Sequence, residues 1–170
     1  SAKAVILRDD QAIAIMVNEE DHLRIQALLP GLQLEEAYQL ASKVDSTIEA
    51  FIPFSFHDKY GYLTSCPTNA GTGLRASVMV HLPALSMTQQ TNNVLVALSK
   101  IGLAVRGSYG EGTEANGNLF QISNQITLGR TEGGIIQDLA KLTKKVIEQE
   151  RMTRDFLLNG KETSVRLTDR

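Results

Sequence analysis

The chain has 170 residues, of which 42% are hydrophobic and 21% are charged, and its formal net charge is −2. This size and composition suit a single folded domain and exclude a disordered, collagen-like or low-complexity chain. The basic residues number 17 against 19 acidic ones, and no apolar run approaches the roughly 20 residues that span a bilayer, so we expect no direct nucleic-acid binding and no membrane association.

The first 51 residues carry strand-like and then helix-like patterns. Short apolar runs at residues 4–7 and 12–17 flank a polar turn, which predicts an antiparallel hairpin. Five polar residues follow, and the pattern at 23–29 is then helical and ends at Pro30-Gly31. Residues 34–51 place apolar side chains at three- and four-residue steps, which predicts an amphipathic helix.

The rest of the chain mixes strand patterns with two further helical ones. The predicted helices span residues 90–101 and a longer stretch that begins near 131–134 and ends at 159; the predicted strands lie at 54–56, 61–63, 74–82, 103–106 and 118–122. Strands and helices do not alternate regularly, so the sequence predicts an α+β fold with a mainly antiparallel sheet flanked by helices.

Three polar clusters interrupt these elements and are the candidates for chemistry. The first, at residues 18–24, contains three consecutive acids, Glu19, Glu20 and Asp21, which repel one another unless a cation offsets their charge. The alternative interpretation is a solvated helix start, because acids favour helix N-termini.

The second cluster is the loop at residues 66–75, which holds Cys66, two glycines and Arg75. The glycines let the backbone approach a ligand closely, although the loop lacks the Gly-Lys-Ser/Thr ending of a Walker A motif. Cys66 is the one cysteine of the chain, so it forms no internal disulfide and favours a reducing, cytoplasmic location. Taken alone, it is better explained as a small buried apolar residue.

The third cluster begins at Arg106 and carries Glu111 on a segment, residues 107–117, that contains four glycines. This segment is either a lid that closes over a ligand or an ordinary surface hairpin. Each cluster supplies one arginine near a strand end, and three converging arginines suit a polyphosphate, whereas the carboxylates and a thiolate suit a guanidinium. Together the clusters indicate phosphorylation of a guanidino group.

These clusters resemble the motifs of the guanidino (phosphagen) kinases, the family of creatine and arginine kinase. The resemblance runs from about residue 13 to 159, and the segments that carry it are 17–24, 66–69, 71–77, 106–107, 110–111, 113–114, 122–124 and 128–129. It implies a guanidino kinase or glutamine synthetase-like catalytic fold, with ATP and Mg²⁺ as cofactors.

The resemblance also implies a role for each candidate residue. Glu20 corresponds to the catalytic carboxylate that holds the guanidinium and accepts its proton, Glu111 to the second carboxylate, and Cys66 to the reactive cysteine. Glu19 corresponds to the acid that orders the water shell of Mg²⁺. The residues that correspond to phosphate-binding arginines are Arg24, Arg75 and Arg106.

Within the family the chain is most similar to the bacterial protein-arginine kinases. Met79 stands where creatine and arginine kinases have a histidine near the nucleotide, and Gln121 stands where they have an aspartate. This branch implies phosphorylation of arginine residues in proteins, which marks the proteins for regulated degradation in the stress response. The implied partners are protein substrates, an activator protein, a Clp-type protease or repressor, and a second copy in a homodimer.

Two alternatives remain open at this point: a kinase for a free guanidino metabolite such as arginine, and a non-catalytic fragment that binds nucleotide or a partner protein. The resemblance further implies that residues 1–160 are the central part of the catalytic domain and that residues 161–170 are a polar tail leading toward an absent C-terminal region. The family's upstream arginine-containing stretch has no match in this sequence. We therefore expect kinase activity of a longer protein that contains this stretch.

Overall fold

The computed structural model describes residues 2–107 and 116–159, which form two compact units. Among the described residues, unit 1 comprises 2–76 and 126–137, and unit 2 comprises 77–107, 116–125 and 138–159. The strands are β1 (Ala4–Leu7), β2 (Ile13–Glu19), β3 (Asp21–Ala27), β4 (Phe56–His57), β5 (Gly61–Tyr62), β6 (Ser77–His81), β7 (Leu103–Gly107) and β8 (Leu119–Asn124). The α-helices are α1 (Leu34–Glu49), α2 (Pro83–Met87), α3 (Thr91–Lys100) and α4 (Glu132–Asn159), and single 3₁₀ turns lie at Pro67–Asn69 and Asn116–Asn118.

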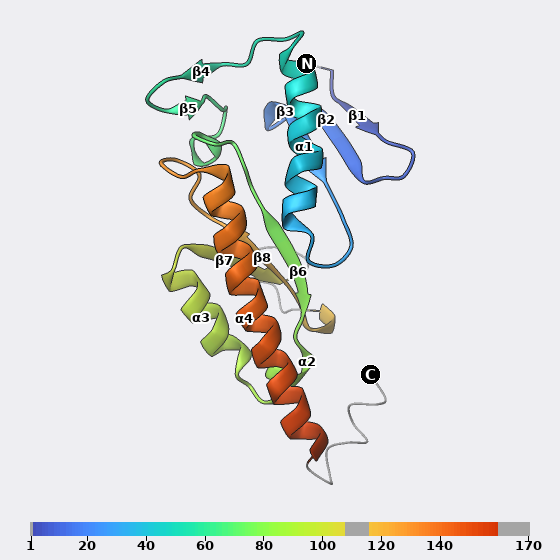
Figure 1. Cartoon of the computed structure of the whole chain (residues 1–170), viewed down its shortest axis with the longest axis vertical. Helices are drawn as coiled ribbons and strands as arrows, with labels where there is room; N and C mark the ends of the chain where they lie inside the picture. The colour runs from blue at the N-terminus through green and yellow to red at the C-terminus, as the bar shows by residue number, and fades with distance from the viewer. Residues whose placement is uncertain (1, 108–115, 160–170) are drawn as a thin grey trace. The chain divides into compact units, whose positions relative to one another are not determined.

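Unit 1 is built on a three-stranded antiparallel sheet in the order β1-β2-β3, and α1 contacts β3 (Figure 1). The predicted hairpin of β1 and β2 and the amphipathic helix are confirmed. At the β1–β2 turn, Arg8 forms a salt bridge with Asp10 at 2.6 Å, and this contact lowers the pKa of the Asp10 carboxyl to about 2. The short hairpin of β4 and β5 carries edge-to-face contacts from Tyr62 to Phe54 and Phe56.

The prediction of a helix over residues 23–29 is wrong, because residues 23–27 belong to strand β3. Its Leu23 and Ile25 lie opposite Val17 and Ile15 of β2 in the antiparallel register. In a segment this short, apolar positions fit a helical and an alternating pattern almost equally well, and cross-strand pairing with β2 decides between them. The hairpin of β2 and β3 therefore replaces the expected strand-to-helix step.

Unit 2 contains a second antiparallel sheet, in the order β6-β8-β7, with α3 contacting β7. Its strands and its long helix confirm the sequence prediction, although β6 covers residues 77–81 only. The most completely buried large apolar side chains of this unit are Leu82, Leu85, Ile122 and Leu139. Helix α2 was not predicted, because five residues are too few to show a periodic pattern.

A buried carboxylate holds the start of α2. The Glu150 side chain on α4 is 7% exposed, and its two oxygens accept hydrogen bonds from the backbone N–H groups of Ala84 and Leu85 at 2.8 and 3.0 Å. Backbone N–H groups in the first turn of a helix have no partner within the helix. Glu150 supplies that partner from a distant position along the chain.

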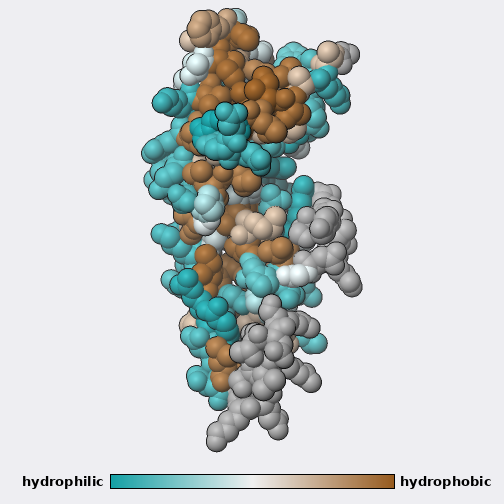
Figure 2. Space-filling view, turned by 90° about the vertical axis from the view of Figure 1, so that its right-hand side faces the viewer, coloured by the Kyte–Doolittle hydropathy of each residue, from teal (hydrophilic) through white to brown (hydrophobic). Residues whose placement is uncertain are grey.

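The surface carries large exposed apolar side chains in both units. Figure 2 shows broad brown areas of apolar surface on one face of the molecule. In unit 1 these exposed residues include Val5, Ile6 and Leu7 of β1 and, after α1, Phe51 and Ile52. None of the helices in the described part of the chain combines the length and apolar composition needed to cross a membrane.

Candidate functional site

The three acids of the first cluster lie at the tip of the β2–β3 hairpin. Glu19 ends β2 and pairs in register with Asp21, the first residue of β3, so that Glu20 forms the turn between them. The interpretation of these acids as a helix start is therefore wrong. Glu20 has a φ of 60°, in the left-handed region that glycine adopts readily and other residues adopt at a cost of roughly 1–2 kcal/mol. Backbone strain of this kind is concentrated at functional sites.

Arg24 provides the cation that the acidic cluster requires. Its guanidinium forms an ion pair with Glu19 and lies 3.5 Å from the Glu20 carboxylate. All three side chains are partly exposed, so the pairs contribute little to stability by themselves. Their effect is local, since they offset the repulsion between neighbouring carboxylates and hold both glutamates beside one arginine.

The second cluster folds into a compact loop around Cys66. The Cys66 side chain is half-buried, and its Sγ atom lies 3.0 Å from the Thr68 hydroxyl, so it is not a core packing residue. The Cys66 carbonyl accepts hydrogen bonds from the Thr64 hydroxyl at 2.6 Å and from the Asn69 backbone N–H at 3.0 Å. These bonds close the 3₁₀ turn at Pro67–Asn69 directly after the thiol.

Asp21 joins the acidic hairpin to this loop. Its Oδ1 accepts a hydrogen bond from the Ser65 backbone N–H at 2.6 Å, and its Oδ2 accepts one from the Asn69 side-chain amide at 3.0 Å. The structure thus places the hairpin with Glu19, Glu20 and Arg24 against the loop with Cys66. No pattern along the chain indicates contacts between segments so far apart, so this role of Asp21 could not be predicted from the sequence.

The same loop is also held by Thr127, a residue that the sequence did not single out. Its hydroxyl lies 3.0 Å from the Thr68 carbonyl oxygen and 2.7 Å from that of Ala70, and the residue is 7% exposed. Next to these contacts, Gly71 has a φ of 103°, and a Cβ there would come within 2.7 Å of the Leu128 Cα. Glycine at position 71 thus allows the loop to approach the segment around Thr127.

The remaining candidate residues are distributed over both units. Arg75 is exposed in unit 1, directly before the buried Ala76, and Arg106 is half-buried on β7 of unit 2. The convergence of the three arginines stays a prediction. Glu111 and most of the glycine-rich segment proposed as a lid lie outside the described residues.

Met79 and Gln121, the two positions that we associated with the bacterial branch, are neighbours in space. Met79 on β6 lies opposite Gln121 on β8, and Gln121 lies opposite Arg106 on β7. The three residues therefore form one row across the sheet of unit 2. Gln121 donates a hydrogen bond to the Ser77 hydroxyl at 3.0 Å, and Met79 is 53% exposed, so this row borders an accessible face.

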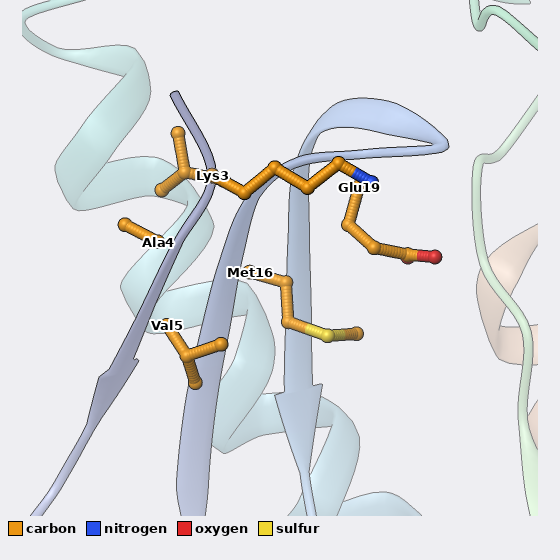
Figure 3. Close-up of a pocket in the computed structure, with 6 residues that line it drawn as sticks. Lys3, Ala4, Val5, Met16 and Glu19 are labelled. Atoms are coloured by element: carbon orange, nitrogen blue, oxygen red, sulfur yellow. The ribbon is translucent and has the colours of Figure 1, made fainter. Parts of the chain in front are cut away.

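A small pocket of about 230 Å³ lies along β1 and β2 of unit 1 (Figure 3). Val5 and Met16 project from paired positions of the two strands, and Glu19 lies at the hairpin end. The pocket is smaller than a typical ligand site of roughly 300–1,000 Å³. Among the described residues, no group of three or more His, Cys, Asp or Glu side chains is arranged to hold a metal ion.

Comparison with protein families identifies a match over residues 1–153 to the family described as ATP:guanido phosphotransferase, C-terminal catalytic domain. The chain is 59% identical over 164 residues to the protein-arginine kinase of Halothermothrix orenii, and the aligned region covers 96% of this chain and 47% of that relative. It is 63% identical over 155 residues to the protein-arginine kinase of Desulforamulus reducens, covering 91% and 43% respectively. The chain thus spans about half the length of the curated relatives that it matches.

Solved structures give the same family. A lombricine kinase superposes with a TM-score of 0.80 at 30% identity, covering 90% of this chain and 43% of that one. A duplicated taurocyamine kinase from Schistosoma mansoni with bound transition-state analogue components superposes with a TM-score of 0.77 at 33% identity, covering 88% and 20%. These neighbours confirm the expected α+β fold with antiparallel sheets flanked by helices.

Proposed function

The chain belongs to the ATP:guanido phosphotransferase family, and we propose that it contributes the catalytic domain of an enzyme that phosphorylates arginine residues in proteins. The observation that carries this proposal is that Asp21 of the acidic hairpin accepts hydrogen bonds from the Cys66 loop. The chain in which this contact occurs is 54–63% identical to curated protein-arginine kinases. Identity to the lombricine and taurocyamine kinases is much lower, at 28–33%.

In this proposal the residues of unit 1 hold and deprotonate the guanidinium. Glu20 at the hairpin tip accepts the proton from the attacking nitrogen, and Cys66 in its thiolate form lies beside a nitrogen that does not react. Glu111 acts as the second carboxylate. Catalysis then consists mainly of alignment and charge stabilisation, as in other phosphoryl transfers.

ATP is the proposed phosphoryl donor, with its phosphates bound by Arg24, Arg75 and Arg106. Mg²⁺ usually keeps several waters and is held through substrate phosphates with one or two carboxylates rather than by a closed set of protein ligands. The described residues fit this arrangement, because Glu19 is a partly exposed carboxylate beside Arg24, the proposed phosphate ligand. Glu19 would hold the water shell of the ion, and Mg²⁺ would neutralise phosphate charge.

A kinase for a free guanidino compound is the second candidate, favoured by the similarity to lombricine and taurocyamine kinases. The two are separated by incubating the full-length protein with ATP and either free arginine or an arginine-rich protein such as a histone. Acid-labile phosphate on the protein alone supports the proposed function, and phosphate on free arginine alone supports the second candidate. If neither the protein nor free arginine is phosphorylated, both candidate functions are contradicted. The remaining interpretation is then a non-catalytic fragment that binds nucleotide or a partner protein.

The broader setting is also part of the proposal. A protein-arginine kinase would mark its substrates for regulated degradation during stress, in the cytoplasm, where a lone free cysteine stays reduced. An activator protein, a Clp-type protease or repressor, and a homodimer are the partners that this role suggests.

Replacing Cys66 by alanine is expected to reduce turnover strongly, and replacing it by serine to reduce it less, if the sulfur acts as a charge partner of the substrate. Because the side chain is only half-buried, both variants should keep the free energy of unfolding within about 1 kcal/mol of the parent. Initial rates and thermal melts on the same samples measure both effects. Loss of rate that follows loss of folded protein would show that Cys66 serves packing instead.

A further inference from the structure

The hydrogen bonds of Asp21 set it apart from its two acidic neighbours. Glu19 and Glu20 contact Arg24 within the hairpin, whereas both oxygens of Asp21 accept hydrogen bonds from the Cys66 loop. The donors are neutral, a backbone N–H and a side-chain amide, and they come from residues 44 and 48 positions along the chain. Asp21 therefore links the two clusters instead of adding to the charge of one.

The two residues that donate these hydrogen bonds flank Cys66 in the sequence. Ser65 immediately precedes Cys66, and Asn69 ends the 3₁₀ turn that follows it. The Asn69 backbone N–H also bonds to the Cys66 carbonyl, so that fixing Asn69 fixes the turn as well. Holding a residue before and a residue after Cys66 leaves the intervening backbone with little freedom to move relative to the hairpin.

Thr127 also contacts this loop, through the Thr68 and Ala70 carbonyls. The two contacts differ in what they fix. Thr127 connects the loop to the segment before α4. Asp21 connects the loop to the β2–β3 hairpin, where Glu20 is the residue immediately before Asp21. Asp21 directly follows Glu20, so its hydrogen bonds link the loop that carries the Cys66 thiol to the residue next to the Glu20 carboxylate.

We propose that Asp21 is a positioning residue that sets the Cys66 thiol relative to the Glu20 carboxylate by hydrogen-bonding Ser65 and Asn69. The proposal rests on the proposed function, since it gives Cys66 and Glu20 a shared substrate. Asp21 acts through the loop and does not touch the guanidinium or the phosphates. This role requires the hydrogen bonds made by the side chain at position 21 and does not require its negative charge. Variants that separate the two properties therefore test the proposal.

The test is a set of four variants in the full-length protein. Asp21→Ala removes both contacts and should lower kcat about 10- to 100-fold, as loss of an outer-shell partner does elsewhere, while KM for ATP changes little. Asp21→Asn should stay within a few-fold of the parent, because its oxygen still accepts from Ser65 and the Asn69 amide can turn its own oxygen toward the new amide. Asn69→Asp places two carboxylates face to face and should lose activity like the alanine variant.

The double variant Asp21→Asn with Asn69→Asp decides the matter. It exchanges amide and carboxylate across the same contact, so the hydrogen bond forms again and kcat should recover. If Asp21→Asn is as inactive as Asp21→Ala and the double variant does not recover, the charge at position 21 acts directly on substrate or metal and the proposal is overturned. Equal thermal melts for all four exclude loss of folding as the cause.

Two further measurements do not depend on activity. Asp21→Ala and Asn69→Asp should speed hydrogen exchange at the Ser65 amide and change the rate at which iodoacetamide alkylates Cys66, and the double variant should restore both. Asp9→Ala, an exposed acid in the β1–β2 turn, is the control and should change neither. Unchanged exchange and alkylation in Asp21→Ala would overturn the positioning role. If the parent transfers no phosphate, the proposed function fails, and these two measurements still decide whether Asp21 places Cys66.

Discussion

Replacing Glu20 by glutamine is expected to abolish phosphoryl transfer while ATP affinity stays within a few-fold of the parent. Glutamine keeps the shape of the side chain but cannot accept the guanidinium proton, and a positioned general base contributes about 10²–10⁴-fold in rate. The Glu20 contact with Arg24 is long, at 3.5 Å, and partly exposed, so its loss should leave Arg24, the proposed phosphate ligand, in place. Single-turnover kinetics and equilibrium titration with ATP measure the two quantities separately.

A matched control for this prediction is Glu36→Gln, an exposed acid on α1 of the same unit. It should alter neither rate nor affinity. Tenfold weaker ATP binding in Glu20→Gln would move this residue into the nucleotide site and contradict its role as the base. A full rate in Glu20→Gln would contradict the assignment altogether.

Replacing Glu150 by alanine should destabilise the fold strongly. The change leaves the N–H groups of Ala84 and Leu85, both fully buried residues, without partners and opens a cavity beneath α2. Buried donors that lose a charged acceptor cost roughly 1–3 kcal/mol each, so we expect a loss of about 3 kcal/mol in the free energy of unfolding. For a chain of this size that corresponds to a fall in Tm of roughly 6–12 °C.

Glu148→Ala is the matched control, because Glu148 is an exposed glutamate on the same helix. It should change the free energy of unfolding by less than about 0.5 kcal/mol. Glu150→Gln should fall between the two, since its amide oxygen can accept one of the two hydrogen bonds while its NH₂ group faces the other donor. Urea denaturation of the three variants gives the comparison, and equal midpoints for Glu150→Ala and Glu148→Ala would contradict the capping role.

The sequence predicts most elements correctly because their patterns are local. The long helix α4 is marked by Ile135, Leu139 and Val146 on one face, all of them buried. Glu150 continues that face one helical turn after Val146, so an acid on an apolar stripe was a signal for its buried role. By contrast, β3 was misassigned because seven residues show both periods, and only the partner strand selects one.

The sequence proposes candidate residues for the site, but it does not indicate the contacts between them. Resemblance picks out Glu20, Cys66 and Arg24, but the contacts of Asp21 and Thr127 with the thiol loop join residues 44 to 59 positions apart. Such pairings follow from the path of the whole chain and leave no mark in a local window of sequence. The same holds for Met79 and Gln121, which the strand register makes neighbours.

The left-handed backbone conformation at Glu20 lowers the stability of the fold, whereas the Glu20 side chain is needed for the proposed chemistry. Glycine adopts a φ of 60° without the steric penalty of a side chain, so Glu20→Gly should raise the free energy of unfolding by up to about 1 kcal/mol. A library of this chain sorted only for resistance to heat or protease would therefore enrich glycine at position 20 and discard the proposed base. Any programme of thermostabilisation has to keep position 20 fixed, or else score phosphoryl transfer alongside survival.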